Sequence, residues 1–316
     1  MAKEVHATRQ TKQIVFLLVL ASLVSAVITL CMGAVRIPVE TTWAVLQRHL
    51  FGQTGHSIPV SMEQIVWQIR VPRIILGFLA GSGLALCGCV MQAVVQNPMA
   101  DPYILGVSAG ATLGATGSLF LGVGVVSGFW AFLGAGLACF LVLALASADG
   151  KTTSVKLILA GMIVNALLTA FSNFIIAVAG NSDGVLSIKF WTMGALTRAG
   201  WKNIGLIAVI VAAATLFFMS QARTLDGLLL GEEAAVTIGI DTFRCRLAYL
   251  LVLSLLTGAL ISACGTIGFV GLIIPHLSRA LVGTAHRRLL PVAGLFGGLF
   301  MLWVDALARS LLPNTE

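Results

Sequence analysis

The sequence predicts an all-α membrane protein that crosses the bilayer many times, and three observations support this class. Only 10% of the 316 residues are charged, whereas soluble domains contain about 25% charged residues. Hydrophobic residues make up 58% of the chain, the mean hydropathy is +1.01, and apolar runs recur along its whole length. These values exclude a single soluble domain, a disordered chain and a nucleic-acid-binding module. The net charge of +7 therefore indicates basic loops beside an anionic membrane surface.

The first apolar run, 14–34, follows a short segment that carries Lys3, Arg9 and Lys12. The run is long enough to span the hydrocarbon core, which needs about 20 residues, whereas the apolar part of a signal peptide is shorter. We therefore expect an uncleaved first span with the N-terminus in the cytoplasm.

Nine spans are expected, because about 20 apolar residues make one pass through the bilayer. The stretch 247–284 is too long for one pass, so its glycines predict a tight turn between two passes. The expected spans are 14–34, 74–97, 104–125, 127–147, 155–179, 203–221, 247–267, 269–284 and 289–312. The cytoplasmic segments then hold 11 lysine and arginine residues and the outside segments hold 8, which is a weak positive-inside bias.

Two expected outside segments, 36–72 and 180–202, are long and partly amphipathic. Both contain tryptophan, which is enriched where membrane meets water. They predict short helices that lie on the outer face.

The chain also matches itself at a shift of 177 residues, where Cys87-Gly88 and Pro98 fall on Cys264-Gly265 and Pro275. The copies begin at the second and seventh spans, so they would have opposite orientations, as in transporters built from inverted repeats. Coincidence in a chain rich in glycine and leucine is the alternative. The expected organisation is one transmembrane domain, 1–316, with repeats at about 73–180 and about 250–316.

The segment 96–102 interrupts the apolar pattern between the second and third spans. Pro98 and Pro102 lack backbone donors, so they should end one helix and begin the next. The segment is either a short capped turn or a gate at the cytoplasmic end of a path. On the fifth span, Asn165 and Asn173 are eight residues apart and share roughly one face. They either bind neighbouring helices or line a polar path.

Asp305 and Arg309 stand four residues apart near the outer end of the ninth span. They either form an ion pair within the membrane, or Arg309 reaches the surface and meets an acidic partner.

The cytoplasmic loop 221–246 predicts one short helix, Glu232–Ile238, with acidic residues in its first turn and Gly239 as its stop. Such a helix carries apolar side chains outside the bilayer. It therefore packs either against a cytoplasmic protein partner or against the membrane surface.

The sequence contains no P-loop, no catalytic triad spacing and no metal-ligand cluster. We therefore expect a transport subunit without catalytic residues, cofactor or metal. It would take its energy from an ion gradient or from a separate ATPase.

A set of motifs follows one another along the chain: Trp67–Arg73, Met91–Pro102, Leu105–Ala111, Trp191–Gly194, Leu230–Ala235, Gly268–His276, His286–Pro291 and Asp305–Arg309. Their order, content and spacing resemble the FecCD family, which comprises permease subunits of ABC importers for iron-siderophores, haem and cobalamin. The resemblance extends from about residue 15 to Glu316.

The resemblance implies ten helices, a homodimer or a pair with a paralogue, two ATPase subunits and a periplasmic or lipid-anchored substrate-binding protein. Arginines at the positions of Arg70, Arg73 and Arg309 face acidic residues of the binding protein in the family. This favours partner docking over a private Asp305–Arg309 pair.

The resemblance also assigns two sets of residues at the cytoplasmic end. The set that would contact the ATPase comprises Leu230, Gly231, Glu232, Glu233, Ala234, Ala235, Ile238 and Gly239. The set beside the translocation path comprises Asn97, Pro98, Met99, Thr152, Thr153 and Ser154, to which the polar pattern adds Asn165.

Family members continue past the position of Glu316 with a tenth helix, which this sequence does not contain; a true truncation and an omitted end both stay open. The expected function is ATP-driven import of a metal chelate across the cytoplasmic membrane. An iron-siderophore is the first expectation, and haem or cobalamin is the alternative. Ion-coupled secondary transport and a membrane enzyme are the competing classes.

Overall fold

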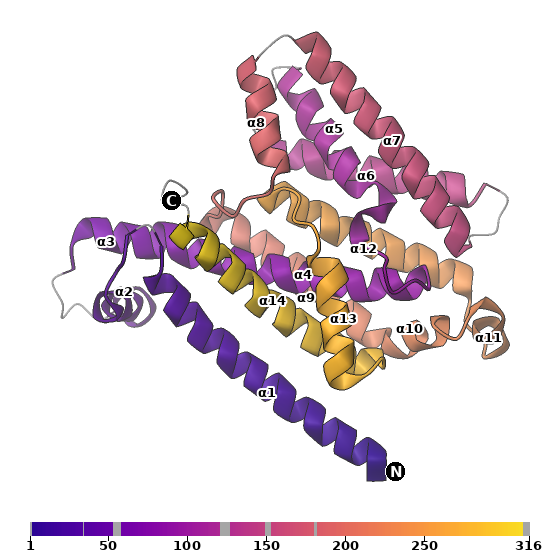
Figure 1. The fold of residues 1–316 in the computed structure, drawn as a ribbon, viewed down its shortest axis with the longest axis horizontal. Helices are drawn as coiled ribbons and strands as arrows, with labels where there is room; N and C mark the ends of the chain where they lie inside the picture. The colour runs from indigo at the N-terminus through magenta and orange to yellow at the C-terminus, as the bar shows by residue number, and fades with distance from the viewer. Residues whose placement is uncertain are drawn as a thin grey trace.

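The computed structural model describes residues 2–33, 35–52, 58–120, 127–148, 153–179 and 182–311, and every regular element in these ranges is helical (Figure 1). The helices at the expected spans are α1 (Ala2–Cys31), α4 (Val71–Val94), α5 (Val107–Phe120), α6 (Ser127–Ala146), α7 (Ser154–Ala179), α9 (Trp201–Ser220), α12 (Thr242–Cys264), α13 (Val270–Val282) and α14 (His286–Leu311). Seven are long and apolar enough to cross a membrane, whereas α5 and α13 have 14 and 13 residues. The predicted all-α polytopic fold is confirmed.

The tight turn predicted within 247–284 is also confirmed. Helix α12 ends at Cys264 and α13 begins at Val270. Gly265 takes a φ of +69° at this point, which a residue without a Cβ adopts readily.

The two amphipathic segments contain short helices, as expected: α2 (Val39–Phe51) and α3 (Val60–Gln64) in the first, and α8 (Ser182–Thr192) in the second. A π-helical turn, η1 (Ile65–Arg70), joins α3 to α4. The His49 ring stacks on Trp67 at a centroid distance of 4.3 Å, and this contact holds α2 against η1. The position of these helices on the outer membrane face stays a prediction.

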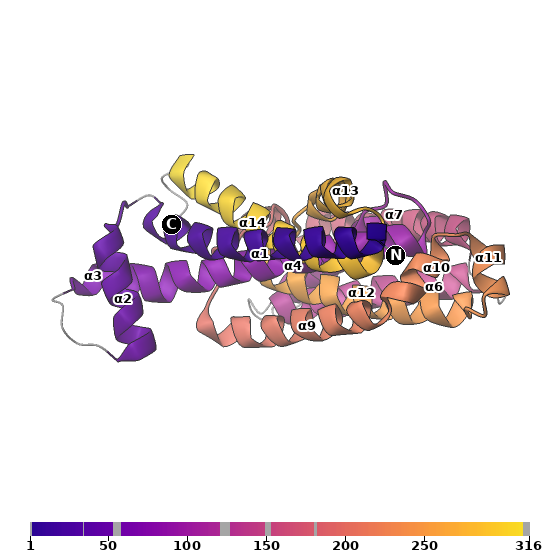
Figure 2. The same ribbon diagram turned by 90° about the horizontal axis from the view of Figure 1, so that it is seen from below.

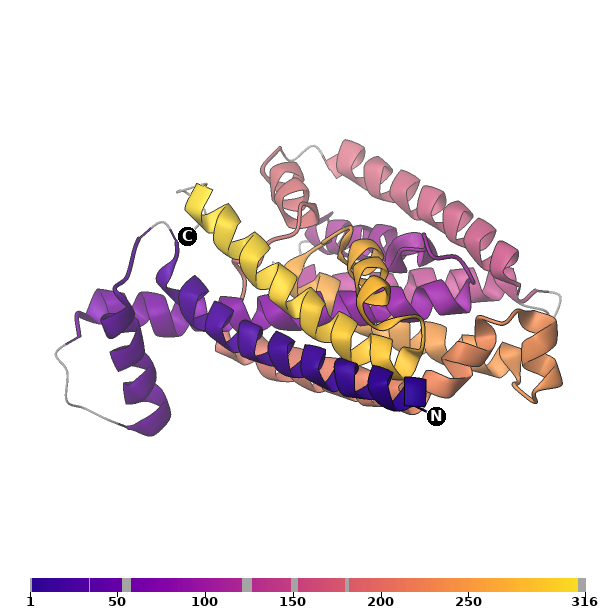
Figure 3. The ribbon, with the colours of Figure 1, turned by 60° about the horizontal axis from the view of Figure 1, so that its bottom comes forward.

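The long helices extend between two ends of the molecule (Figure 2). We call one the α2 end, where α2 and α3 lie. The other is the α11 end, where α10 (Ala222–Leu228) and α11 (Glu232–Thr237) lie. Helix α1 runs beside α14, and both reach the α2 end with their C-terminal residues (Figure 3).

Helix α4 is the centre of the packing, because 20 of its 24 residues are buried. Its backbone touches that of α14: a Cβ added at Gly81 would lie 2.1 Å from the carbonyl oxygen of Gly297. Helices α5 and α6 approach equally closely at Gly110 and Gly134. Glycine at these positions therefore permits the close contact of the helices.

The residues matched by the internal repeat occupy different settings. Cys87-Gly88 lies within α4, whereas Cys264-Gly265 ends α12. Pro98 lies in the turn after α4, whereas Pro275 lies inside α13. The repeat and its boundaries stay predictions.

The α4–α14 contact leads to a stability prediction. Replacing Gly297 with Ala places a methyl group 2.4 Å from the carbonyl oxygen of Gly81, so we expect a loss of about 1–3 kcal/mol in unfolding free energy. Thermal unfolding of the purified protein in detergent measures this loss. Gly136→Ala is the matched control, because nothing lies within 4 Å of a Cβ at this position on α6. Equal unfolding midpoints for the two variants would contradict the packing argument.

Candidate functional site

A cavity of about 640 Å³ opens where α7 crosses the 3₁₀ turn η2 (Pro102–Leu105) and the start of α5. Its wall is mostly apolar, and its polar lining residues are Asp101, Tyr103, Ser108, Asn165 and Thr266. These residues come from three separate parts of the chain: 101–108, α7 and the α12–α13 turn.

Hydrogen bonds of Asp101 and Tyr103 fix the backbone that lines this cavity. The Asp101 carboxylate accepts the backbone N–H of Tyr103 at 2.8 Å and caps η2. The Tyr103 hydroxyl donates to the carbonyl of Ile267 at 3.0 Å and accepts that residue's N–H at 3.2 Å. Tyr103 therefore joins the start of α5 to the α12–α13 turn.

Helix α7 can lie close to this backbone because Gly106 has no side chain. A Cβ at Gly106 would lie 3.2 Å from the backbone nitrogen of Asn165, and the φ of Gly106 is +65°. This approach brings Asn165 to the cavity, as the polar pattern of α7 suggested.

The exposed surface of α7 carries a polar stripe of Asn165, Thr169 and Asn173. At about 100° per residue these positions cover an arc of about 80° on the helix. The buried residues of α7, such as Val164 and Leu168, lie on one side of the stripe, and exposed apolar side chains follow on the other. The stripe continues the polar lining of the cavity along α7.

The segment after α4 forms a capped turn. The Asn97 side chain accepts the N–H of Met99 at 2.9 Å, and the Asn97 carbonyl accepts the N–H of Ala100 at 3.1 Å. Pro98 and Met99 are exposed.

At the start of α7, the Thr153 hydroxyl accepts the N–H of Lys156 at 3.4 Å, and Ser154 is the first helical residue. Thr152 lies outside the described residues. Asn165 lines the cavity, whereas Asn97–Met99, Thr153 and Ser154 do not.

The loop helix predicted at 232–238 is confirmed as α11, Glu232–Thr237, followed by Ile238 as its C-cap and by Gly239 at a φ of +86°. Ala235 is buried against the rest of the protein. Leu230, Val236 and Ile238 are 66%, 57% and 60% exposed. An apolar surface thus faces away from the protein at the α11 end.

The Arg73 and Arg309 side chains are buried at the α2 end and share one carboxylate. Arg73 Nη2 lies 2.9 Å from Asp305 Oδ1, and Arg309 Nε lies 3.0 Å from Asp305 Oδ2. Arg309 also donates to the carbonyls of Met32 and Thr29 at the end of α1. The Asp305–Arg309 pair, which the resemblance disfavoured, is present, and it includes a second arginine from α4.

Arg70 is fully buried and also binds the end of α1. It donates to the carbonyl of Leu30 at 2.8 Å and to that of Val35 at 2.6 Å. All three arginines predicted for docking therefore have partners within this chain.

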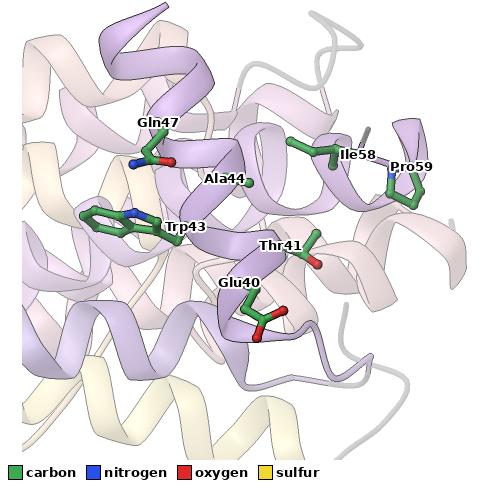
Figure 4. A pocket seen from close by; sticks show the side chains of 7 residues that line it. All are labelled: Glu40, Thr41, Trp43, Ala44, Gln47, Ile58 and Pro59. Atoms are coloured by element: carbon green, nitrogen blue, oxygen red, sulfur yellow. The ribbon is translucent and has the colours of Figure 1, made fainter. Parts of the chain in front are cut away.

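A second cavity, of about 460 Å³, lies at the α2 end (Figure 4). Glu40, Trp43 and Gln47 of α2 line it together with Ile58 and Pro59. It is far along the chain from the polar stripe of α7 and belongs to the surface of this end.

The sequence did not identify several residues of the site. Asp101, Ser108 and Thr266 line the cavity although only the fold brings them together. Asp226 and His286, 60 residues apart, form a contact that no local pattern could indicate.

A helical fold with many apolar spans, a cavity that carries a few polar side chains and an exposed apolar loop helix fits a multi-pass membrane permease. The chain belongs to the FecCD transport family, whose profile matches residues 17–316, and it is the permease subunit of an ABC importer. This membership favours an ABC importer over the ion-coupled transporter and the membrane enzyme.

Two relatives and one solved structure illustrate the similarity. The chain is 39% identical to the cobalamin import system permease protein BtuC of Halobacterium salinarum, over 85% of this chain and 73% of that protein. It is 33% identical to the molybdate import system permease protein MolB of Haemophilus influenzae, over 95% of this chain and 88% of that protein. An ABC transporter of metal-chelate type in an inward-facing conformation superimposes with a TM-score of 0.84 at 31% identity, over 96% and 93% of the two chains.

The shared carboxylate leads to a second prediction. Asp305→Asn leaves two buried guanidinium groups without their counter-charge, so we expect a loss of about 3–5 kcal/mol in unfolding free energy. Thermal unfolding in detergent measures it. Asp241→Asn is the control, because Asp241 pairs with Arg244 at an exposed site and such changes usually stay within about 0.5 kcal/mol. If the Asp305→Asn protein is as stable as this control, the ion pair has no structural role.

Proposed function

We propose that this permease moves a metal chelate across the cytoplasmic membrane by ATP-driven alternating access, together with two ATPase subunits, a substrate-binding protein and a second permease. The N-terminus and the α11 end would face the cytoplasm. ATP binding would close the ATPase pair, move the α11 end and change the side to which the path opens.

The exposed apolar surface of α11 is the observation that carries the ATPase contact. Leu230, Val236 and Ile238 are exposed in the segment that joins α9 to α12 at one end of the molecule (Figure 1). A protein partner would cover this apolar surface. Glu232, Glu233, Ala234 and Gly231 would complete the contact.

The polar stripe of α7 supports the path. Polar side chains exposed in a membrane face a cavity or another protein rather than lipid. Asn165, Thr169 and Asn173 would therefore face the space between two permeases. The turn at Asn97–Met99 and the start of α7 at Thr153 and Ser154 would lie beside the cytoplasmic opening.

The α2 end would receive the binding protein. In this conformation Arg70, Arg73 and Arg309 hold the end together from inside, so direct contact with an acidic partner would require them to leave their present partners. Arg36, Arg198 and Lys202 are exposed at the same end, which Trp201 joins to Trp67 through a 2.9 Å hydrogen bond. These exposed cations would attract acidic residues of the binding protein before it docks.

An iron-siderophore is the proposed cargo, because it is the largest substrate class that the resemblance implies. Cobalamin is the second candidate, since the Halobacterium salinarum relative at 39% identity imports it. Haem stays a third candidate through the hemin permease HmuU of Yersinia pestis, at 32% identity.

The ATPase contact is testable by adding charge to α11. Val236→Glu and Ile238→Glu should each cost about 2 kcal/mol of binding, or about 30-fold in affinity, because the carboxylate is buried in an apolar contact. Co-purification of the ATPase with the tagged permease measures the loss. Val60→Glu is the control, an equally exposed apolar residue at the α2 end. If the α11 variants still retain the ATPase, the proposed contact is wrong.

The path and the cargo are testable in one assay. Proteoliposomes that contain the complex and its binding protein should take up a ferric siderophore only with ATP. Asn165→Phe should lower the uptake severalfold because it fills the cavity, whereas Ile163→Phe, on the apolar side of α7, should not. Uptake of cyanocobalamin instead of the siderophore would assign the second candidate. Uptake that follows a proton or sodium gradient without ATP would refute the proposed energy source.

A further inference from the structure

One contact joins the α11 end to α14, a long helix whose C-terminal residues lie at the α2 end (Figure 3). The Asp226 side chain, on α10, accepts the backbone N–H of His286 at 2.8 Å, and the same oxygen lies 2.6 Å from His286 Nδ1. His286 is the first residue of α14 and is 1% exposed. The first N–H groups of a helix have no partner within it, and a carboxylate there also complements the helix dipole.

Helices α10 and α11 form one unit, which we call the α10–α11 segment. A Cβ at Gly227, next to Asp226, would lie 2.3 Å from the side chain of Ile240 and 3.3 Å from that of Ile238, so the chain after α11 packs directly on α10. The end of α11 thus lies directly beside Asp226.

The same segment is attached to α4. Gln96 donates its side-chain N–H to the carbonyl of Leu228, the last residue of α10, at 2.7 Å. Gln96 takes a φ of +53°, which is uncommon for a residue with a side chain. The backbone of the turn after α4 thus directs the Gln96 side chain to α10.

Helix α14 extends from this contact to the α2 end. It has 26 residues and is therefore about 39 Å long. Ser82 of α4 donates to the carbonyl of Gly294 at 2.8 Å beside the Gly81–Gly297 contact. At the far end of α14 lies Asp305 with its two arginines.

We propose that Asp226 is a positioning residue that makes α14 follow the α10–α11 segment when the ATPase moves it. This inference rests on the proposed function, because it takes the ATPase to bind at α11. Arg246, on α12, lies 3.2 Å from Glu232 and holds the other side of the segment. The links to α4, α12 and α14 thus connect the docking segment to both ends of the path.

Contact alone does not establish coupling, so the test compares uptake with hydrolysis in the complete reconstituted complex. Asp226→Ala should leave the ATPase attached and hydrolysing, while cargo moved per ATP falls about fivefold or more. Asp226→Asn retains an oxygen that can accept the N–H of His286, so it should restore most of the ratio. Asp241→Ala is the matched control, because Asp241 caps its own helix α12 through the N–H of Arg244 at 3.0 Å.

An unchanged ratio in Asp226→Ala, or a parallel fall of uptake and hydrolysis, would overturn the inference. Amide hydrogen exchange in the wild-type complex gives a second measurement that needs no variant. ATP should change the protection of the first turn of α14, and no change there would also overturn it. A wild-type complex without bound ATPase would instead refute the proposed function.

Discussion

Lipid tails are as apolar as leucine side chains, so helices in a bilayer are held together by close packing more than by hydrophobic burial. The contact between Gly81 and Gly297 is the place where this constraint acts most strongly on the protein, because α4 is buried almost throughout and α14 lies against its backbone. Any side chain at either position would separate the two helices. The positions of α1, which packs on α14, and of α13, which packs on both, depend on this contact.

The buried charges follow from the same packing. Arg73 enters at the start of α4 and Asp305 lies near the end of α14, so the close contact of the two helices brings oppositely charged groups together. A buried ion needs a counter-charge and further hydrogen bonds. Arg309 and Arg70 find these further hydrogen bonds at the backbone carbonyl oxygens at the end of α1 and just after it. The last carbonyls of a helix have no partner within the helix and are therefore available as acceptors. The first helix is therefore fastened to the others by its own C-terminal end.

Local signals predicted most of the fold. Apolar runs gave the spans, glycine gave the turn at 265–269, and acidic residues followed by Gly239 gave α11. The setting of Arg73 could not be predicted, because its partner Asp305 is 232 residues away and nothing in either neighbourhood indicates the other. Asn165 was found through its spacing from Asn173, whereas Asp101 and Thr266 reach the same cavity only through tertiary packing. The link from Asp226 to His286 was missed for the same reason.

The exposed face of α7 is divided between polar and apolar side chains. Its buried side packs on α5 through residues such as Val164 and Leu168, so the helix cannot turn its polar stripe inward without exposing them. An asparagine facing lipid would lack partners for its side-chain amide. The apolar side chains that continue around α7, such as Phe171 and Phe174, have no such need. The apolar half can meet lipid, whereas the polar half cannot do so without the loss of hydrogen bonds, so the two halves require different neighbours. Asn165, at the cavity between η2 and α7, lies on the polar half.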